Sequence, residues 1–332
     1  MEFRYLGRSG LRVSALSYGT WVTFGDQIGE EPAAACLKAA YEAGVNFFDA
    51  AEAYAHGKAE IMLGGLIRKF GWKRTDLVLS TKIFWGGEGP NDSGLSRKHI
   101  VEGVEAALKR LKVDYIDLVF CHRPDIQTPV EETVRAMSSV IDRGLAFYWG
   151  TSEWPAERIR EAFHIARGEH LIPPTMEQPQ YNMFTRARVE REYAGLYRDF
   201  GLGTTIWSPL ASGFLTGKYL KEIPEGSRLS LAGYDWLKNR FAGPEGREKA
   251  QKVAKLAGLA SELDITLPRL AIAWCLKNPD VSTVITGASR AEQVVENMQA
   301  LDDVPLLTDD VMEAIEAILG NKPQPEPDFR TQ

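Results

Sequence analysis

The stretch IDLVFCHRPDIQTPVEETVRAMSSVIDRGLAFYWGT, residues 116–151, contains one complete strand–helix–strand unit. Its two ends, IDLVFCH and AFYWGT, are apolar runs of strand length. Between them lies an amphipathic segment with helix signals: Thr128 is the predicted N-cap, and Glu131 completes a capping box with it. Pro129 stands in the first turn, and Gly144 follows the last. This order predicts two parallel strands joined by a helix.

Apolar runs of the same kind recur along the whole chain. The first seven begin between 29 and 39 residues apart, which is the length of one strand–helix unit. There are eight such runs. In order along the chain they are VSALSYG from Val13, VNFFDA from Val45, LVLSTK from Leu77, IDLVFCH from Ile116, AFYWGT from Ala146, TMEQPQ from Thr175, TTIWSP from Thr204 and TVITGAS from Thr283.

Eight such units favour an α/β fold closed into a (β/α)8 TIM barrel, because the strands are apolar on both faces. The alternative is an open, doubly wound sheet, which would carry a G-x-G-x-x-G turn after its first strand. The turn here, SYGTWVTFGDQ at residues 17–27, does not fit that pattern. We therefore predict a single barrel domain over residues 1–332.

Three segments depart from the repeat. Residues 1–13 predict a β-hairpin that turns at Ser9–Gly10 and caps the N-terminal end of the barrel. The step from the seventh run to the eighth is 79 residues, so a long loop after the seventh strand must precede two further helices, the second over residues 267–279. The proline-rich tail, about residues 321–332, is predicted to be extended.

The bulk composition excludes several classes of function. A net charge of -6 leaves no basic excess for binding nucleic acid. Cys36, Cys121 and Cys275 lack metal-ligand spacing and are predicted to be buried thiols. The five histidines also lack ligand spacing, so no metal site is expected. Without a signal-peptide core or an apolar run of about 18 residues, we expect a cytoplasmic protein with no membrane insertion.

Four ionisable side chains follow successive strands at the barrel end where active sites lie. Asp49 and Tyr54 follow the second strand, Lys82 ends the third and His122 follows the fourth. We expect Lys82 to lower the pKa of Tyr54, Asp49 to hold Lys82 charged, and His122 to share the proton load. A phenol acidified in this way can protonate a carbonyl oxygen that receives a hydride. The alternative is an Asp49–Lys82 ion pair that closes the barrel mouth, with ordinary loop residues beside it.

These residues lie within longer strings that resemble the aldo-keto reductases, in particular the branch containing the β subunits of voltage-gated potassium channels and their plant and bacterial relatives. The strings include LGRSGLRVSALSYGTWVTFG, STKIFWGG, FYWGTSEW and WSPLASGFLTGKY, and they span nearly the whole chain. The resemblance implies an NADPH-dependent aldehyde reductase, with ketones left open, whose catalytic tetrad is Asp49, Tyr54, Lys82 and His122. Animal channel subunits carry asparagine at the position of His122, so the histidine favours an enzyme.

The resemblance also implies how NADPH would be held. Trp207 would stack on the nicotinamide, unless it is a core tryptophan, and Ser152 and Gln178 would hydrogen-bond the carboxamide. Charge for the 2′-phosphate is expected from Lys218, Arg228 or Arg290, because Ala288 replaces the lysine that many reductases carry there. The full implied set is Thr20, Trp21, Gln27, Asp49, Ser152, Gln178, Trp207, Ser208, Pro209, Leu210, Ala211, Ser212, Lys218, Arg228, Gly287, Ser289, Gln293, Glu296 and Asn297.

Other features have two interpretations each. Ser289 is the predicted N-cap of a helix with Glu292 three residues later, and this helix start either binds a phosphate or is a plain cap. Trp21, Trp85 and Trp154 form either an apolar substrate wall or core packing. A second function is also open, namely a regulatory channel β subunit that senses its cofactor. The resemblance further implies a homo-oligomer, most simply a tetramer, while the physiological carbonyl and the strictness for NADPH stay open.

Overall fold

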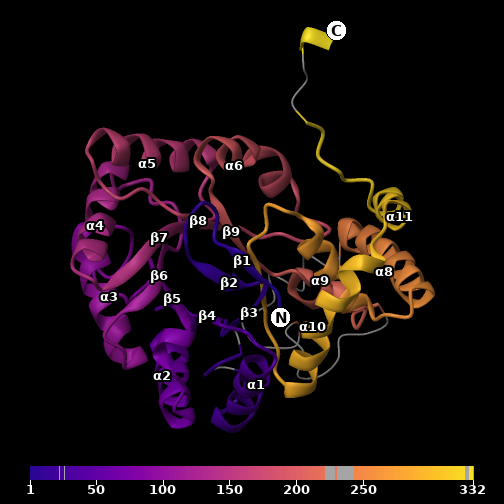
Figure 1. Ribbon diagram of the computed structural model, residues 1–332, viewed down its shortest axis with the longest axis horizontal. Coiled ribbons are helices and arrows are strands. Elements are labelled where there is room, and N and C mark those ends of the chain that lie inside the picture. The colour runs from indigo at the N-terminus through magenta and orange to yellow at the C-terminus, as the bar shows by residue number, and fades with distance from the viewer. Residues whose placement is uncertain (22, 26, 221–228, 230–242, 326–328, 332) are drawn as a thin grey trace. The chain divides into compact units, whose positions relative to one another are not determined.

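Eight parallel strands close into a barrel in the order β10-β3-β4-β5-β6-β7-β8-β9 (Figure 1). The pairing of β10 with β3 closes the ring, so the predicted (β/α)8 barrel is confirmed and the open sheet is excluded. The strands are β3 Leu16–Gly19, β4 Phe47–Asp49, β5 Val78–Ile83, β6 Ile116–Cys121, β7 Ala146–Ser152, β8 Met176–Gln178, β9 Gly203–Trp207 and β10 Thr283–Thr286.

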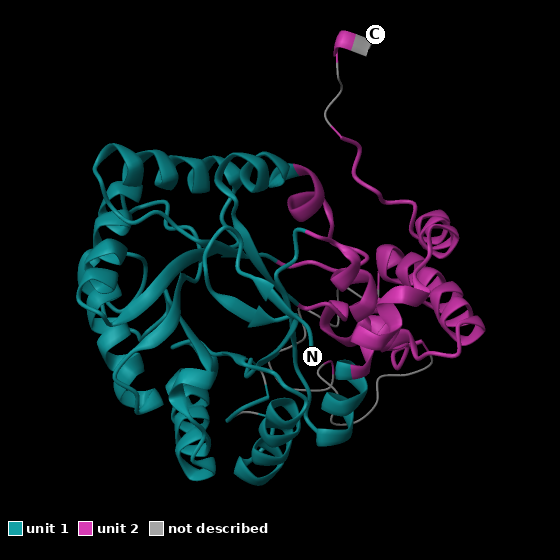
Figure 2. Ribbon diagram, viewed as in Figure 1, with its two compact units in different colours: residues 1–179, 192–207, 280–298 teal, residues 180–191, 208–279, 299–332 magenta. Residues whose placement is uncertain are grey.

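The computed structural model describes residues 1–21, 23–25, 27–220, 229, 243–325 and 329–331. The chain divides into two compact units (Figure 2). The first unit contains residues 1–179, 192–207 and 280–298, and therefore the entire barrel. The second contains residues 180–191, 208–279 and 299–332. The single domain expected over residues 1–332 stays a prediction.

Helices α1 to α6 of the first unit lie around the outside of the strands (Figure 1). Among the residues described between the long loop and β10, two helices, α8 and α9, precede β10 as predicted. The loop after β9 contains the short helix η4, and its residues 221–228 and 230–242 lie outside the described residues. The helices are α1 Glu30–Glu42, α2 Lys58–Phe70, α3 Arg97–Leu111, α4 Val130–Asp142, α5 Ala156–Gly168, α6 Ala194–Phe200, α8 Pro244–Glu262, α9 Leu267–Lys277, α10 Ala291–Asp303 and α11 Asp309–Leu319, with short helices η1 Tyr54–Gly57, η2 Arg74–Asp76, η3 Arg188–Glu192, η4 Ala211–Thr216, η6 Val304–Leu306 and η7 Phe329–Thr331.

The alternation of side chains along each strand divides the barrel interior into an apolar and a polar level. The apolar core cluster contains Leu6, Val13, Phe47, Val78, Leu118, Phe120, Met176 and Ile285. Four polar residues each follow a member of this cluster by two or four positions along the chain, and therefore lie on the same face of the strand. These residues are Asp49, Lys82, His122 and Gln178. The intervening residues point outward, as Thr81 does when it hydrogen-bonds Glu60 on α2. The strand pattern therefore gathers the polar residues at the C-terminal end of the barrel.

The predicted N-terminal hairpin is confirmed, with β1 Phe3–Tyr5 pairing antiparallel to β2 Arg12–Ser14. It lies at the amino ends of β9 and β10, where the Gly7 amide donates to Ser282 Oγ at 3.4 Å. Gly7 has φ +57°, and a Cβ there would stand 2.4 Å from Gly203 N, so only glycine fits. The first barrel strand was predicted from Val13 but begins at Leu16, because Val13 is already paired within the hairpin.

Two local predictions are wrong at helix ends. Thr128 does not cap α4: its hydroxyl donates to Asp125 Oδ2 at 2.7 Å, and Pro129 occupies the N-cap position. The carboxylate of Asp125, three positions before Thr128, thus accepts the hydrogen bond of the side chain that was predicted to cap the helix. Residues 186–201, RARVEREYAGLYRDFG, carry the sequence pattern of one amphipathic helix, but the structure divides them into the π-helix η3 and α6.

The three cysteines are buried and free, as predicted. Over the described part of the chain, no helix is long and apolar enough to cross a bilayer.

Candidate active site

A buried lysine connects two of the predicted catalytic residues. Lys82 Nζ lies 2.5 Å from Asp49 Oδ2 and donates to the Tyr54 hydroxyl at 2.9 Å and to the Ala50 carbonyl at 2.8 Å. The exposed fraction is 0% for Lys82 and 2% for Asp49, so water does not screen this pair. The structure therefore brings Asp49, Lys82 and Tyr54 together in one hydrogen-bonded chain.

Asp49 is fixed by hydrogen bonds from β5, from β8 and from Thr20, which follows β3. Its Oδ1 accepts from Ser80 Oγ at 2.7 Å and from Gln178 Nε2 at 3.1 Å. Its backbone carbonyl accepts from the Thr20 amide and hydroxyl, both at 3.0 Å. Gln178 also donates to Thr205 Oγ1 at 3.3 Å, which holds its side chain across the barrel. A carboxylate held in this way keeps Lys82 aimed at the phenol.

The electrostatics of Tyr54 differ from the prediction. Burial raises the pKa of Tyr54 well above its ordinary value, the Asp49 charge raises it further, and the Arg123 charge lowers it. In the resting site, burial and the Asp49 charge outweigh the hydrogen bond from Lys82, so the net shift in the pKa of the phenol is upward. Burial also lowers the pKa of Lys82, an effect that Asp49 opposes. Tyr54 is therefore a neutral phenol at physiological pH and holds the proton that a general acid needs.

His122 also differs from the prediction. Burial, followed by the charges of Lys82 and Arg123, lowers the pKa of its imidazole well below the ordinary value. The ring is therefore neutral near pH 7, so it is able to hydrogen-bond a substrate but not to carry the charge that was predicted for it. Its centroid lies 5.7 Å from that of Tyr54, and its buried Nδ1 has no hydrogen-bond partner among the described residues.

The turn that carries Tyr54 is strained and firmly anchored. Ala55 and His56 both adopt positive φ angles, 49° and 53°, which residues other than glycine rarely do. Such strain is characteristic of functional segments held by their surroundings. The anchor is the buried Glu52, whose Oε1 accepts from the Phe84 amide at 2.7 Å and lies 3.3 Å from His99 Nε2. Burial opposes protonation of His99, but its contacts with Glu52 prevail and raise its pKa.

Aromatic side chains stand beside the phenol. Trp207 donates its indole N–H to Glu153 Oε1 at 3.0 Å, and its ring meets Trp21 edge-on at 5.6 Å. Trp21 lies 6.5 Å from the Tyr54 ring. Trp207 is half-buried rather than a core residue. Trp85 contacts His122 at 5.0 Å and is exposed, whereas Trp154 is buried, as core packing requires.

The predicted cofactor residues of the first unit occupy the C-terminal strand ends and the start of α10. Ser152 Oγ donates to the Gln178 carbonyl at 2.9 Å. The predicted cap at Ser289 is wrong, because α10 begins at Ala291 and Gln293, rather than Glu292, accepts from the Ser289 amide at 3.1 Å. Gly287 follows β10, while Glu296 and the buried Asn297 lie on α10.

The remaining cofactor residues belong to the second unit or are not described. Ser208, Ala211 and Ser212 have positive φ angles of 57°, 47° and 59°, so the backbone after β9 is strained in the way that Tyr54's turn is. Lys218 Nζ lies 5.0 Å from the Tyr219 ring centroid. Arg228 lies outside the described residues.

Sequence analysis overlooked Arg123. Its Nη1 donates to the His122 carbonyl at 2.5 Å and to Ser152 Oγ at 3.3 Å. Its charge lowers the pKa of Tyr54, Lys82 and His122. The signal that would have found it is its position directly after His122, at the strand end where the other site residues stand.

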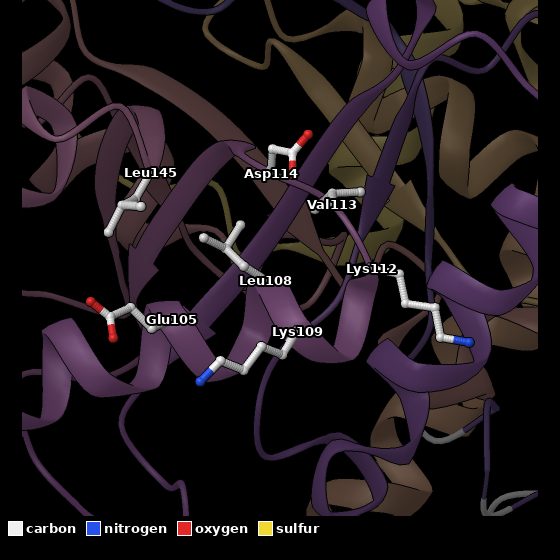
Figure 3. A pocket seen from close by; sticks show the side chains of 7 residues that line it. All are labelled: Glu105, Leu108, Lys109, Lys112, Val113, Asp114 and Leu145. Atoms are coloured by element: carbon white, nitrogen blue, oxygen red, sulfur yellow. The ribbon is translucent and has the colours of Figure 1, made fainter.

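An open groove of about 490 Å³ lies elsewhere on the first unit (Figure 3). Val113, Asp114 and Leu145 stand just before β6 and β7, so the groove is at the amino end of the barrel, opposite the four residues. Its other lining residues come from α3 and the turn after it: Glu105, Leu108, Lys109 and Lys112. It is separate from the candidate site. Over the described residues, no group of His, Cys, Asp and Glu side chains could hold a metal ion.

Comparison with known proteins agrees with this geometry. The profile of the Aldo/keto reductase family matches residues 15–320. A protein of Oryza sativa subsp. japonica, named a probable voltage-gated potassium channel subunit beta, is 57% identical over 331 residues, which cover 99% of this chain and 100% of that protein. A protein of Arabidopsis thaliana with the same name is 55% identical, with the same coverage. The predicted resemblance is confirmed, and the chain belongs to the aldo/keto reductase family.

Proposed function

We propose that this oxidoreductase reduces aldehydes to alcohols with NADPH, with ketones left open as further substrates. One observation carries the proposal, namely that the buried Lys82 donates to the Tyr54 hydroxyl at 2.9 Å while Asp49 holds it at 2.5 Å. A lone Asp49–Lys82 pair would close the barrel equally well without a phenol or a strained turn. The connected phenol favours proton transfer over a purely structural ion pair.

The residues at the strand ends suit a nicotinamide cofactor. Trp207 offers a half-buried ring beside Trp21, and Ser152 and Gln178 provide polar groups on adjacent strands. These side chains would hold the nicotinamide, which supplies hydride when bound. The contacts proposed for Ser208, Pro209, Leu210, Ala211, Ser212 and Lys218 in the second unit, and for Arg228, rest on the likeness to the family.

The chain's own residues would manage the proton. Neutral Tyr54 donates its proton to the carbonyl oxygen, and the Lys82 ammonium then stabilises the tyrosinate across the 2.9 Å hydrogen bond. Asp49 holds Lys82 in place, and neutral His122 helps to orient the carbonyl oxygen. Because Asp49, Lys82 and His122 are buried and the hydrogen bonds to Tyr54 and Asp49 are already formed, little reorganisation is needed during the reaction.

Cofactor titration followed by an aldehyde panel tests the proposal. NADPH should quench tryptophan fluorescence and bind more tightly than NADH. Replacing Lys218→Ala should weaken NADPH binding about ten- to a hundredfold and spare NADH, since a charge-assisted contact to the 2′-phosphate is worth about 1.5–3 kcal/mol. Equal losses for both cofactors would mean that Lys218 does not contact the 2′-phosphate. Lys255→Ala on α8 serves as a matched control.

His122→Asn tests the contribution of the imidazole. Asparagine keeps a neutral N–H donor but is shorter and loses the ring packed against Tyr54 and Trp85. We expect aldehyde turnover to fall about tenfold, which is about 1.4 kcal/mol of barrier, while NADPH still binds.

Because the pKa of His122 is lowered, wild-type turnover should show no inflection near pH 6.5. An inflection there that disappears in His122→Asn would show that the ring does titrate. Intact turnover in the variant would make His122 a structural residue.

A second candidate function follows from the two relatives, whose names describe channel β subunits. In this proposal the chain is a cytoplasmic homotetramer that associates with a potassium channel and senses its cofactor. Single-turnover kinetics separate the two functions, because a sensor would retain NADP⁺ over many minutes whereas a dedicated reductase would exchange it quickly. Light scattering measures the oligomeric state.

A further inference from the structure

The guanidinium of Arg123 stands beside the catalytic residues with part of its donor set in use. Nη1 donates to the His122 carbonyl at 2.5 Å and to Ser152 Oγ at 3.3 Å. Its Cζ lies 5.6 Å from the centroid of Trp85, which packs on His122. The side chain is half-buried, so these contacts fix its direction while leaving it accessible.

Arg123 is not part of a structural ion pair in the described part of the chain. The neighbouring carboxylates are engaged with other donors. Asp125 accepts from the Leu95 amide at 2.8 Å and from the Thr128 hydroxyl at 2.7 Å, and Glu153 accepts from Trp207. Asp49 is held by Lys82. An arginine kept for stability would ordinarily face a carboxylate, so this one is available for an anion from outside the chain.

The charge of Arg123 also reaches the reaction centre. It lowers the pKa of His122, and because the charge of Lys82 is matched by Asp49, Arg123 is a source of positive potential at this end of the barrel. A localised positive potential in a partly buried site raises the local concentration of anions. An anionic substrate would gain from this potential, whereas a neutral one would not.

We propose that Arg123 binds the carboxylate of the substrate, so that aldehydes bearing a carboxylate are the preferred class. This inference rests on the proposed reductase function. The planar guanidinium matches a carboxylate in a two-point contact that lysine cannot form. Arg123 is connected to Tyr54 through two ring contacts: its Cζ lies 5.6 Å from the Trp85 centroid, and Trp85 packs on His122, which faces Tyr54. An aromatic aldehyde with a carboxylate on the same ring is therefore a suitable probe of this arrangement.

The test compares 4-carboxybenzaldehyde with its methyl ester, which has the same reacting group but no charge. Wild type should reduce the acid with a kcat/KM about ten- to a hundredfold above that of the ester. Arg123→Gln should abolish this preference, and Arg123→Lys should retain only part of it. Arg198→Gln on α6, where the side chain is 79% exposed, is the control that should keep the wild-type ratio. The readout is the ratio of the kcat/KM values for the two aldehydes. An effect of Arg123 on Tyr54 would change both values alike and would cancel in this ratio.

Benzoate binding without cofactor, measured by calorimetry, provides a second readout that does not need turnover. Wild type should bind benzoate and Arg123→Gln should not. An unchanged acid-to-ester ratio in Arg123→Gln would overturn the inference, as would a loss confined to NADPH affinity, which would make Arg123 a cofactor contact. If wild type binds NADPH but reduces neither aldehyde, the proposed function fails. In that case, benzoate binding that depends on Arg123 still supports a carboxylate site at Arg123. Absence of such binding overturns the inference.

Discussion

Replacing Tyr54→Phe should slow aldehyde reduction by about 10²–10⁴-fold, because general acid catalysis typically contributes this much. The fold and NADPH affinity should be nearly unchanged. The phenyl ring keeps its place beside Trp21 and His122, and Lys82 loses only one of its three hydrogen-bond acceptors. Steady-state turnover with saturating aldehyde, together with a fluorescence titration of NADPH, measures both quantities.

Tyr41→Phe is the matched control for this substitution. Tyr41 stacks on Trp72 at 4.0 Å on the outside of the barrel, so the change removes a hydroxyl far from the strand ends. Wild-type turnover is expected for it. A loss below tenfold in Tyr54→Phe would assign proton donation to another group. Because burial raises the pKa of Tyr54, reduction should also stay constant through about pH 6–9, where the phenol remains protonated.

Replacing Lys82→Met should remove nearly all activity and also destabilise the protein. The variant leaves the Asp49 charge buried without its partner, and breaking a buried pair in this way typically costs about 3–5 kcal/mol. Turnover should fall at least as far as in Tyr54→Phe, because the tyrosinate loses its nearby positive charge. Urea denaturation gives the change in the free energy of unfolding, and turnover gives the change in activity.

The double variant Asp49→Asn/Lys82→Met separates stability from catalysis. The amide removes the unpaired charge, and its oxygen still accepts from Ser80 and Gln178. We expect the double variant to recover most of the lost stability and none of the activity. Recovery of activity together with stability would show that the Asp49–Lys82 pair only supports the fold.

The sequence by itself determined the architecture and the gathering of the residues proposed to be catalytic. The spacing of its apolar runs predicted the (β/α)8 barrel, the hairpin and the two helices before β10. The two-residue period of each strand also brings Asp49, Lys82, His122 and Gln178 to the same end of the barrel. These features follow from local periodicity, which neighbouring residues encode regardless of what surrounds them.

Local sequence patterns predicted the wrong helix caps where two hydrogen-bond partners compete for the same group. Thr128 satisfied the capping pattern, but its hydroxyl donates to Asp125, whose carboxylate also accepts the Leu95 amide from another segment. The cap predicted at Ser289 is wrong for a similar reason, because the side chain of Gln293 accepts the hydrogen bond from the Ser289 amide. No local pattern reveals such competition, since it depends on which acceptors lie closer in space.

Only the tertiary structure decided the charge states and the role open to Arg123. Sequence reasoning placed a cation beside Tyr54 and expected a lowered pKa, yet burial and the Asp49 charge raise that pKa. It expected His122 to titrate, yet burial keeps the ring neutral. Solvation and charge compensation are sums over every neighbouring group in three dimensions, so they cannot be read from the order of residues along the chain.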